Sequence, residues 1–342
     1  MATTACAPTK RSAVGFLSKF VKPPDHYFPL AYLTGKLTLT ALPFSFMPTS
    51  FASVVLYLMS EKGYAILSHI VKEFDYTIIK HVIGARDNNV ENDFYEDIKA
   101  LCAQANIPFL DRTQQVVVSP ATVALAVSWR WLIAGANGLV VMHDSLLPRY
   151  RGFAPLVNCL INGEPEIGVT ALYASAEFDR GDIIAQASRP VNYPITIAQA
   201  INLSVQCYIE LVDHIWPAWV EGRALLAQPQ NEEQASYSLW RDEQDYCMDW
   251  QRDSHYLRRF VDALGWPYKG AAARLNDQPV RILAVEAETD VYIENRTPGK
   301  VLFISQQQPV VVCGTGLLRL LTVHDEAGKS VLPLKQFRSR FT

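Results

Sequence analysis

The sequence has little of what binds metal ions or cross-links small domains. Its six cysteines lie far apart without a Cys-x-x-Cys pair, and its seven histidines show no His-x-x-x-His spacing. Such spacings are typical of zinc sites and disulfide scaffolds. We therefore expect no metal site, and we expect the cysteines to be buried free thiols of a reducing compartment.

Long apolar runs and polybasic runs are also missing. The apolar stretches near the N-terminus are interrupted by proline and are too short to span a bilayer. The formal net charge of -3 gives no general attraction for nucleic acid. These absences predict a cytoplasmic protein that acts on small molecules without a membrane or nucleic-acid partner. The sequence leaves a homodimer open.

The first fifty residues carry several cations against a single acid, Asp25, together with many Thr and Ser residues. This composition is typical of a transit peptide. Two other interpretations stay open, namely a structured accessory arm and an upstream extension before a true start at Met47. We treat residues 1–50 as an N-terminal extension that catalysis does not need.

Strand and helix patterns alternate after this extension. Residues 51–58, 76–84, 116–118, 124–128 and 138–142 have strand character, and residues 60–73 and 92–105 have a helical rhythm. The alternation predicts an α/β domain over residues 51–229 with a doubly wound, mostly parallel, Rossmann-like sheet. A long helix over 195–221 closes this domain, and we expect it to bend or break near Pro217.

A polar stretch at 228–234 suits a linker to a smaller domain, residues 230–342. A helix is expected over 255–264. Short alternating segments follow, separated in several places by Gly and Pro turns, at 280–284, 291–293, 300–305, 310–313 and 317–323. This pattern predicts a small, OB-like β-barrel.

The run MHDSLLPRYRGFAP, Met142 to Pro155, outweighs every other motif. His143 ends an apolar strand and precedes a loop with a hydroxyl, two guanidinium groups and open backbone N–H groups. Asp179 stands thirty-six residues later in a second turn. Ligands bind at the carboxyl ends of strands in such sheets. An imidazole there, with a carboxylate to orient it and a cationic loop, predicts acyl-group chemistry.

This pairing resembles the formyltransferase family that uses 10-formyltetrahydrofolate and acts on glycinamide ribonucleotide, methionyl-tRNA or nucleotide sugars. The resemblance covers about 51–225 and, more weakly, 236–335, where Met248-Asp249-Trp250 and Pro298-Gly299-Lys300-Val301 look like the family's barrel domain. It implies catalysis by His143 and Asp179, with Asp182 a turn residue. The implied contacts to the folate co-substrate are Trp131, Leu132, Ile133, Ser145, Leu146, Leu147, Pro148, Ser175, Ala176, Glu177, Phe178 and Asp179. Those implied for the acceptor are Arg149, Tyr150, Arg151 and Gly152.

Formyl transfer to an amine passes through a tetrahedral intermediate. The amine loses a proton while the carbonyl oxygen gains charge, and a histidine can serve either change. The family normally has an asparagine two residues before this histidine, as a donor to the oxyanion. Here Val141 stands there and cannot donate from its side chain, so a non-catalytic folate- or nucleotide-binding homologue is one alternative.

The residues after the loop, from Phe153 to Gly163, resemble the sugar enzymes. The leading prediction is therefore N-formylation of a nucleotide-linked amino sugar, as in O-antigen or related lipopolysaccharide synthesis. Methionyl-tRNA formylation is the second. That relative grips its tRNA with a basic loop, whereas the segment from Arg86 to Asp93 carries one cation and three acids.

Overall fold

The computed structural model describes residues 53–88, 90–114, 122–133 and 138–342, all of which belong to one compact unit. The expected extension, the start at Met47 and the strand at 116–118 lie outside the described residues. The domain boundary at 229/230 stays a prediction. Among the described residues, no helix is long and apolar enough to cross a membrane.

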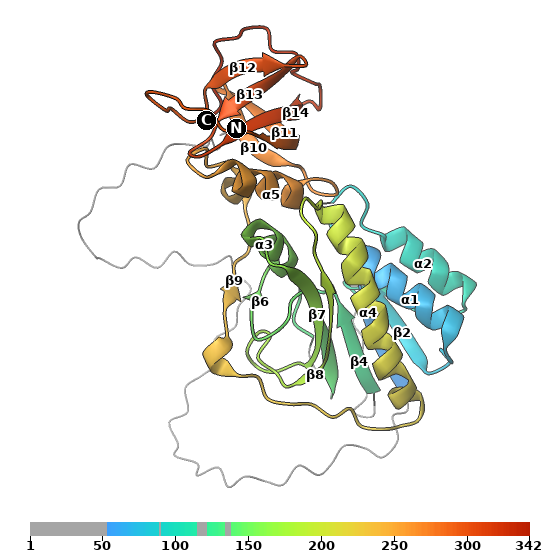
Figure 1. Ribbon diagram of the computed structural model, residues 1–342. Coiled ribbons are helices and arrows are strands. Elements are labelled where there is room, and N and C mark those ends of the chain that lie inside the picture. The colour runs from blue at the N-terminus through green and yellow to red at the C-terminus, as the bar shows by residue number, and fades with distance from the viewer. Residues whose placement is uncertain (1–52, 89, 115–121, 134–137) are drawn as a thin grey trace, which may run out of the picture. The chain divides into compact units, whose positions relative to one another are not determined.

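A seven-stranded sheet organises the first part of the chain (Figure 1). The five strands from β3 to β5 are parallel, and β7 and β8 join antiparallel at one edge. In spatial order the strands are β3 (Phe109–Asp111), β2 (Ile79–Gly84), β1 (Ser53–Leu58), β4 (Thr122–Val127), β5 (Leu139–His143), β7 (Glu166–Tyr173) and β8 (Ile183–Pro190). The predicted mostly parallel, Rossmann-like sheet is confirmed.

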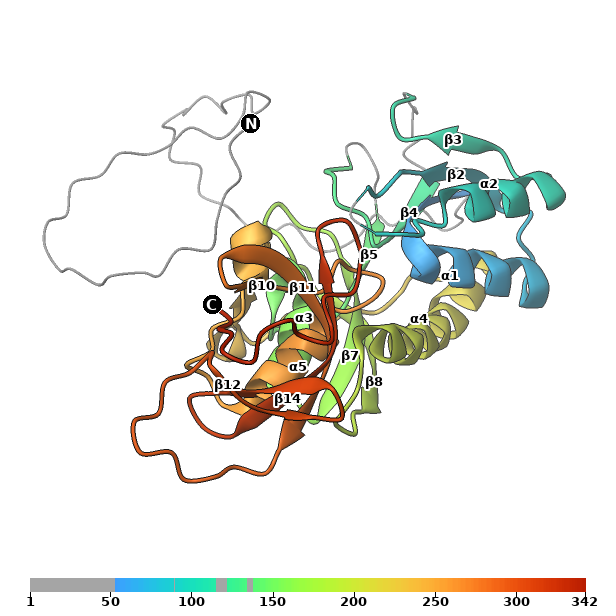
Figure 2. The ribbon, with the colours of Figure 1, turned by 90° about the horizontal axis from the view of Figure 1, so that it is seen from above.

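Helices cover one face of this sheet. They are α1 (Ser60–Glu73), α2 (Tyr95–Gln104) and α4 (Ile197–Val220), and α1 and α4 lie side by side (Figure 2). The periodic residues Ile66, Leu67 and Ile70 of α1 are fully buried, which explains why this helix matches its prediction. The expected break near Pro217 is wrong. Because this proline lies in the last turn, α4 continues to Val220 at the cost of one backbone bond.

The opposite face of the sheet carries a small apolar cluster. Its buried members are Val55, Tyr57, Ile83, Ala124 and Ala126, with Trp129, Ile133, Leu139 and Val141 partly buried against them. These are alternate residues of the strands that pack on the helices through their other face. His143 lies two residues after Val141 on β5 and therefore points to the side of this cluster.

A five-stranded antiparallel sheet forms the C-terminal part, in the order β10 (Ala271–Leu275), β11 (Gln278–Glu288), β14 (Leu317–Asp325), β13 (Gln308–Val312) and β12 (Val301–Ser305). The C-terminal tail bonds to both edges, since Phe341 bridges to Leu275 and Arg340 to Lys300. This closure agrees with the predicted small barrel. The strand expected at 291–293 is wrong, because Arg296 holds that segment in a loop through Asp290 and the Val291 carbonyl.

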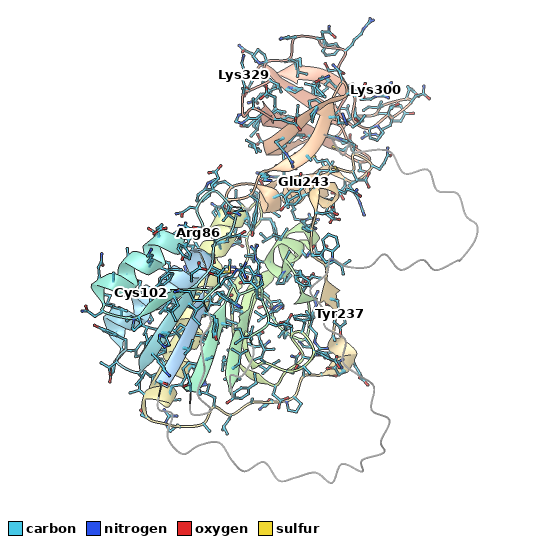
Figure 3. The ribbon with its side chains drawn as sticks, turned by 180° about the vertical axis from the view of Figure 1, so that it is seen from behind. Arg86, Cys102, Tyr237, Glu243, Lys300 and Lys329 are labelled. Carbon is cyan, nitrogen blue, oxygen red and sulfur yellow. The ribbon has the colours of Figure 1, made fainter. Side chains whose placement is uncertain are left out.

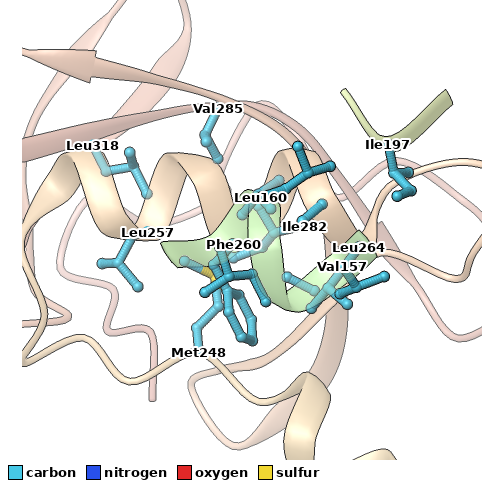
Figure 4. Close-up of a cluster of buried hydrophobic side chains, with 14 of the residues drawn as sticks. Val157, Leu160, Ile197, Met248, Leu257, Phe260, Leu264, Ile282, Val285 and Leu318 are labelled. Atoms are coloured by element: carbon cyan, nitrogen blue, oxygen red, sulfur yellow. The ribbon is translucent and has the colours of Figure 1, made fainter. Parts of the chain in front are cut away.

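Two further helices, α3 (Pro155–Asn162) and α5 (Ser254–Leu264), contribute to a core shared with the C-terminal sheet (Figure 4). Leu160 of α3 lies in this core with Leu257 and Phe260 of α5 and with Ile282 and Leu318 of the sheet. Since α3 begins directly after the His143 loop, its burial fixes one end of that loop.

Candidate active site

His143 is the last residue of β5 and is buried, with 7% of its surface exposed. It pairs across the sheet with Thr170 of β7. The Thr170 hydroxyl donates to the Ser145 carbonyl at 2.7 Å and accepts from the Leu147 N–H at 3.1 Å. The start of the predicted loop is therefore fixed to a neighbouring strand. The His143 imidazole is thus attached to backbone that is held in place on both sides.

The loop after His143 folds back over the imidazole. The Nε2 atom of His143 donates to the Tyr150 carbonyl at 2.8 Å, and the Ser145 hydroxyl donates to the Arg149 carbonyl at 2.7 Å. Tyr150 has a positive φ of 60°, a conformation that turns its carbonyl toward the ring. Because Nε2 carries a proton for this bond, the other ring nitrogen, Nδ1, is left for chemistry.

Asp179 meets that second nitrogen. Its Oδ1 lies 3.5 Å from Nδ1 of His143, and its Oδ2 accepts from the Gly152 N–H at 2.8 Å. Both side chains are largely buried, with 8% and 14% exposed. The competing carboxylate of Asp182 makes no hydrogen bond or ion pair within the described part of the chain. The geometry thus joins His143 to Asp179, and the catalytic roles of both stay predictions.

The residues predicted to contact the folate fall into two environments. Leu132 and Phe178 are widely exposed, as are Ser175, Ala176 and Glu177, whereas Ser145 and Leu147 are buried. Trp131 is 38% exposed and lies 4.2 Å beneath the Arg112 guanidinium. Ile133, Leu146 and Pro148 are half-buried. Trp131 and Leu132 follow β4 at the end of the sheet where His143 emerges. The residues from Ser175 to Phe178 follow β7, which is antiparallel to β5, so their turn starts beside the first residue of β5. This turn returns to the His143 loop, where Asp179 accepts from the Gly152 N–H and the Phe178 ring lies beside that of Phe153.

The residues predicted to bind the acceptor already have partners in the chain. Arg149 makes a two-pronged ion pair with Glu164, and this bond lowers the pKa of the glutamate. The Tyr150 hydroxyl donates to the same carboxylate, and burial raises its pKa to about 12. The Gly152 N–H donates to the Asp179 carboxylate.

Arg151 differs from the prediction. It is fully buried, and its guanidinium donates to Gln230 and Glu232. It therefore has no surface to offer a ligand, and the predicted contact between Arg151 and the acceptor is not supported by this arrangement.

Sequence reasoning missed a buried charged cluster next to His143. Lys62 of α1 donates to Asp144 at 2.6 Å, and the Tyr208 hydroxyl of α4 donates to the other oxygen of Asp144 at 3.0 Å. Burial raises the Tyr208 pKa well above its usual value. The signal in the sequence that could have revealed this cluster is Lys62, a lysine within the apolar face of a helix. The cluster anchors the residue after His143 to α1 and α4.

Val141 packs among the apolar residues of its sheet face and is half-buried. Its side chain cannot take the place of the asparagine donor, as the sequence predicts. The nearby Asn137 lies outside the described residues.

Comparisons with known proteins agree with this architecture. Residues 100–202 match the family described as formyl transferase, and residues 241–341 match the formyl transferase C-terminal domain. The methionyl-tRNA formyltransferase of Herpetosiphon aurantiacus is 32% identical over 203 residues, 59% of this chain and 65% of that protein. The chain thus spans less than two thirds of that relative.

The methionyl-tRNA formyltransferase of Ralstonia nicotianae is 30% identical over 235 residues, which cover 69% of this chain and 71% of that protein. Among solved structures, an N-formyltransferase from Helicobacter canadensis superposes with a TM-score of 0.61 at 15% identity, over 78% of this chain and 98% of that one. The likeness to the Helicobacter canadensis structure shows the fold. The similarity to the Ralstonia nicotianae protein, together with the two matched domains, shows the family. The chain belongs to the formyl transferase family.

Proposed function

We propose that this protein transfers a formyl group from 10-formyltetrahydrofolate to a primary amine. The observation that carries the proposal is the 3.5 Å contact between His143 Nδ1 and Asp179 Oδ1 at the carboxyl end of β5, in a chain of the formyl transferase family. The Helicobacter canadensis structure was determined with folinic acid, a folate, which supports the same class of co-substrate.

The described residues fit a folate at this end of the sheet. Trp131 and Leu132 follow β4 at the carboxyl end of the parallel strands, where ligands of such sheets bind. The turn with Phe178 folds back to the His143 loop, and the exposed rings of Phe178 and Phe153 lie 6.3 Å apart there. The half-buried Ile133 and Val141 add an apolar wall on the sheet face. A flat pteridine ring suits such surroundings. When bound, the folate supplies the formyl group.

His143 and Asp179 would handle the proton of the reaction. Because Nε2 donates to the Tyr150 carbonyl, Nδ1 is the basic atom of the neutral ring, and it takes the proton that the acceptor amine loses. The resulting imidazolium is stabilised by the charge of the Asp179 carboxylate, whose Oδ1 lies 3.5 Å from Nδ1. This attraction is gained as charge develops, so it favours the transition state over the ground state.

The oxyanion needs a donor other than residue 141. The valine side chain has none, and loss of one such donor costs about 3 kcal/mol of transition-state stabilisation in other enzymes. Once charged, the His143 imidazolium places a positive charge near the reacting centre. We therefore assign it both tasks, proton acceptor and electrostatic support for the oxygen.

For the acceptor we propose a nucleotide-linked amino sugar. The segment after β2 that would grip tRNA is neutralised, because Arg86 pairs with both Asp93 and Glu96. Arg149 keeps 54% of its side chain exposed and can turn from Glu164 to a phosphate. The Helicobacter canadensis enzyme, determined with dTDP-3-aminofucose, provides a precedent for such an acceptor on this fold.

Methionyl-tRNA is the second candidate acceptor. The two relatives described above, from Herpetosiphon aurantiacus and Ralstonia nicotianae, are both named methionyl-tRNA formyltransferase. Exposed cations also gather at the C-terminal tail, where Lys335, Arg338 and Arg340 have no acidic partner among the described residues and Arg340 bridges to Lys300. Figure 3 shows Lys300, just before β12, and Lys329, after the end of β14, both away from Arg86. Such a surface attracts phosphates.

Competing acceptors test the proposal. The purified protein is given 10-formyltetrahydrofolate with either a panel of nucleotide-linked amino sugars or methionyl-tRNA, and the formylated products are measured. We expect transfer to a sugar amine, with weak dependence on salt. Efficient formylation of methionyl-tRNA without transfer to any sugar would overturn the acceptor assignment, and no transfer to either would overturn the activity. A triple variant, Lys335→Gln, Arg338→Gln and Arg340→Gln, is the matched control, because it removes the cationic tail and should leave sugar transfer unchanged.

A further inference from the structure

The stretch that looks like a linker is hydrogen-bonded to the two loops that carry His143 and Asp179. We name residues 230–238 the strap. The Ser236 N–H donates to the Pro148 carbonyl at 3.1 Å, and the Ser236 carbonyl accepts from the Arg151 N–H at 2.8 Å. Strands β6 (Arg151–Gly152) and β9 (Tyr237–Ser238) then pair in parallel and lie side by side in Figure 1. The strap therefore runs directly along the loop that begins at His143.

The Gln230 amide lies between the two loops of the site. Its Nε2 donates to the carbonyls of Asp179 at 2.7 Å and Gly181 at 2.8 Å. Its Oε1 accepts from the Arg151 guanidinium at 2.7 and 3.0 Å. A guanidinium can only donate and a carbonyl can only accept, so one orientation of the amide satisfies all four bonds.

Arg151 makes this amide immobile. The arginine is fully buried and binds Glu232 of the strap at 2.8 and 2.9 Å, in addition to Gln230. A buried charge is costly to leave unpaired, so the guanidinium and its two strap partners hold one geometry. Gln230 is fixed at its oxygen end and presents its N–H groups to the Asp179 turn.

Asp179 needs such a restraint. Its φ of 56° lies in the left-handed region, which a residue other than glycine adopts at an energetic cost. The Gly152 N–H holds its side chain, and Gln230 holds its backbone carbonyl. Loss of either contact would let the turn relax and carry the carboxylate away from His143.

We infer that Gln230 is a positioning residue that sets the Asp179 carboxylate against His143, with Arg151 and the strap as its support. The inference rests on the proposed function. Gln230 touches neither reacting group and acts through Asp179. Catalysis by the sheet domain accordingly depends on the segment that leads into the C-terminal sheet.

Two substitutions of Gln230 and a matched control separate positioning from folding. Gln230→Ala removes all four bonds, whereas Gln230→Glu keeps the acceptor for Arg151 and loses the donors to Asp179 and Gly181. Gln234→Ala is the control, because that glutamine lies exposed in the same strap and its side chain makes no hydrogen bond to the described residues. We expect both Gln230 variants to lower kcat by on the order of tenfold to a hundredfold with KM for both substrates little changed, the usual scale for a misplaced catalytic group.

A combination with Asp179→Asn gives the sharper test. If Gln230 acts through Asp179, Gln230→Glu should lower kcat little further in the Asp179→Asn background. Multiplied losses would overturn the inference. So would a Gln230→Glu variant that turns over like the control, or one that fails to fold and thus marks the amide as structural.

Crystal structures of the free variants need no turnover. The distance between His143 Nδ1 and Asp179 Oδ1, which is 3.5 Å in this chain, should lengthen in both Gln230 variants and stay the same in Gln234→Ala. An unchanged distance in the Gln230 variants contradicts the positioning role. A lengthened distance in a protein that transfers no formyl group keeps the positioning role and refutes the proposed function instead.

Discussion

Replacement of Asp179 by asparagine separates the electrostatic role of this carboxylate from its structural role. Asparagine keeps an oxygen that can accept from the Gly152 N–H, now bound at 2.8 Å, so the turn is retained. The charge that faces His143 is lost. Turnover should therefore fall while the melting temperature stays similar.

The size of the effect follows from the distance. Two unit charges 3.5 Å apart attract by about 5 kcal/mol at an effective dielectric constant of about 20, and by about 1 kcal/mol in water. Because the two side chains are 8% and 14% exposed, the value should lie in the upper half of this range. We expect kcat to fall by on the order of a hundredfold to a thousandfold.

Asp182→Asn is the control for this experiment, since the same change is made three residues along the same turn. Steady-state kinetics and thermal melting of both variants provide the comparison. A mild loss for Asp179→Asn and a severe loss for Asp182→Asn would refute the reasoning, because it would identify the other carboxylate as the partner of His143.

Four further outcomes follow from the same geometry. His143→Ala should lower kcat by roughly a hundredfold or more while folate binding, measured by calorimetry, survives; retention of most activity would remove this residue from the mechanism. Val141→Asn adds the donor that the family normally has, and should raise transfer or leave it unchanged; abolished transfer would show that the site depends on the valine. Burial raises the Asp262 pKa to about 6, so the folded state disfavours its ionised form and this cost appears as pH rises from about 4 through 6. Asp262→Asn should then stabilise the protein at pH 7 by up to about 3 kcal/mol and give no gain below pH 4, which denaturant unfolding at both pH values would check. Protein started at Met47 should fold and turn over normally, and insolubility of that shorter protein would show that the extension covers apolar surface.

The sheet and its helices could be predicted because their signals are local. In α1, apolar residues recur at helical spacing and Ile66, Leu67 and Ile70 are buried in the core, so one short segment contains the whole signal. The strands β7 and β8 and the helix α3 were not predicted. The helix α3 and the strand β7 lie between the two site motifs, and β8 follows the second motif. Most residues of β8 are only half-buried because it forms the edge of the sheet, so it has no clear apolar pattern.

The two central side chains of the candidate site could be predicted from the sequence, but the residues that hold them in place could not. His143 and Asp179 stand in turns with recognisable composition, and the structure brings their side chains together. The strap was interpreted as a linker, because its glutamines and glutamates are polar and locally patternless. Its bonds to Arg151 join residues 79 and 81 positions apart, and no local pattern reveals such a contact.

Burial also decides whether a charged residue can bind a ligand or only support the fold. Arg149 and Arg151 look equivalent in the sequence, yet the first is half-exposed and the second is fully buried. The difference arises because β6 pairs with β9, which places the strap over Arg151. An arginine expected to bind a ligand thus supports the site from within.

The central claim is that His143 and Asp179 move a formyl group from 10-formyltetrahydrofolate to an amine. The most direct test supplies folate labelled with ¹³C in its formyl carbon to the wild-type protein and to His143→Ala, with a nucleotide-linked amino sugar as acceptor. Mass spectrometry then follows the label. We predict that the wild type places the labelled formyl group on the sugar amine and that the variant does so at least about a hundredfold more slowly. Equal labelling by both proteins, or none by the wild type with any acceptor, would contradict the claim.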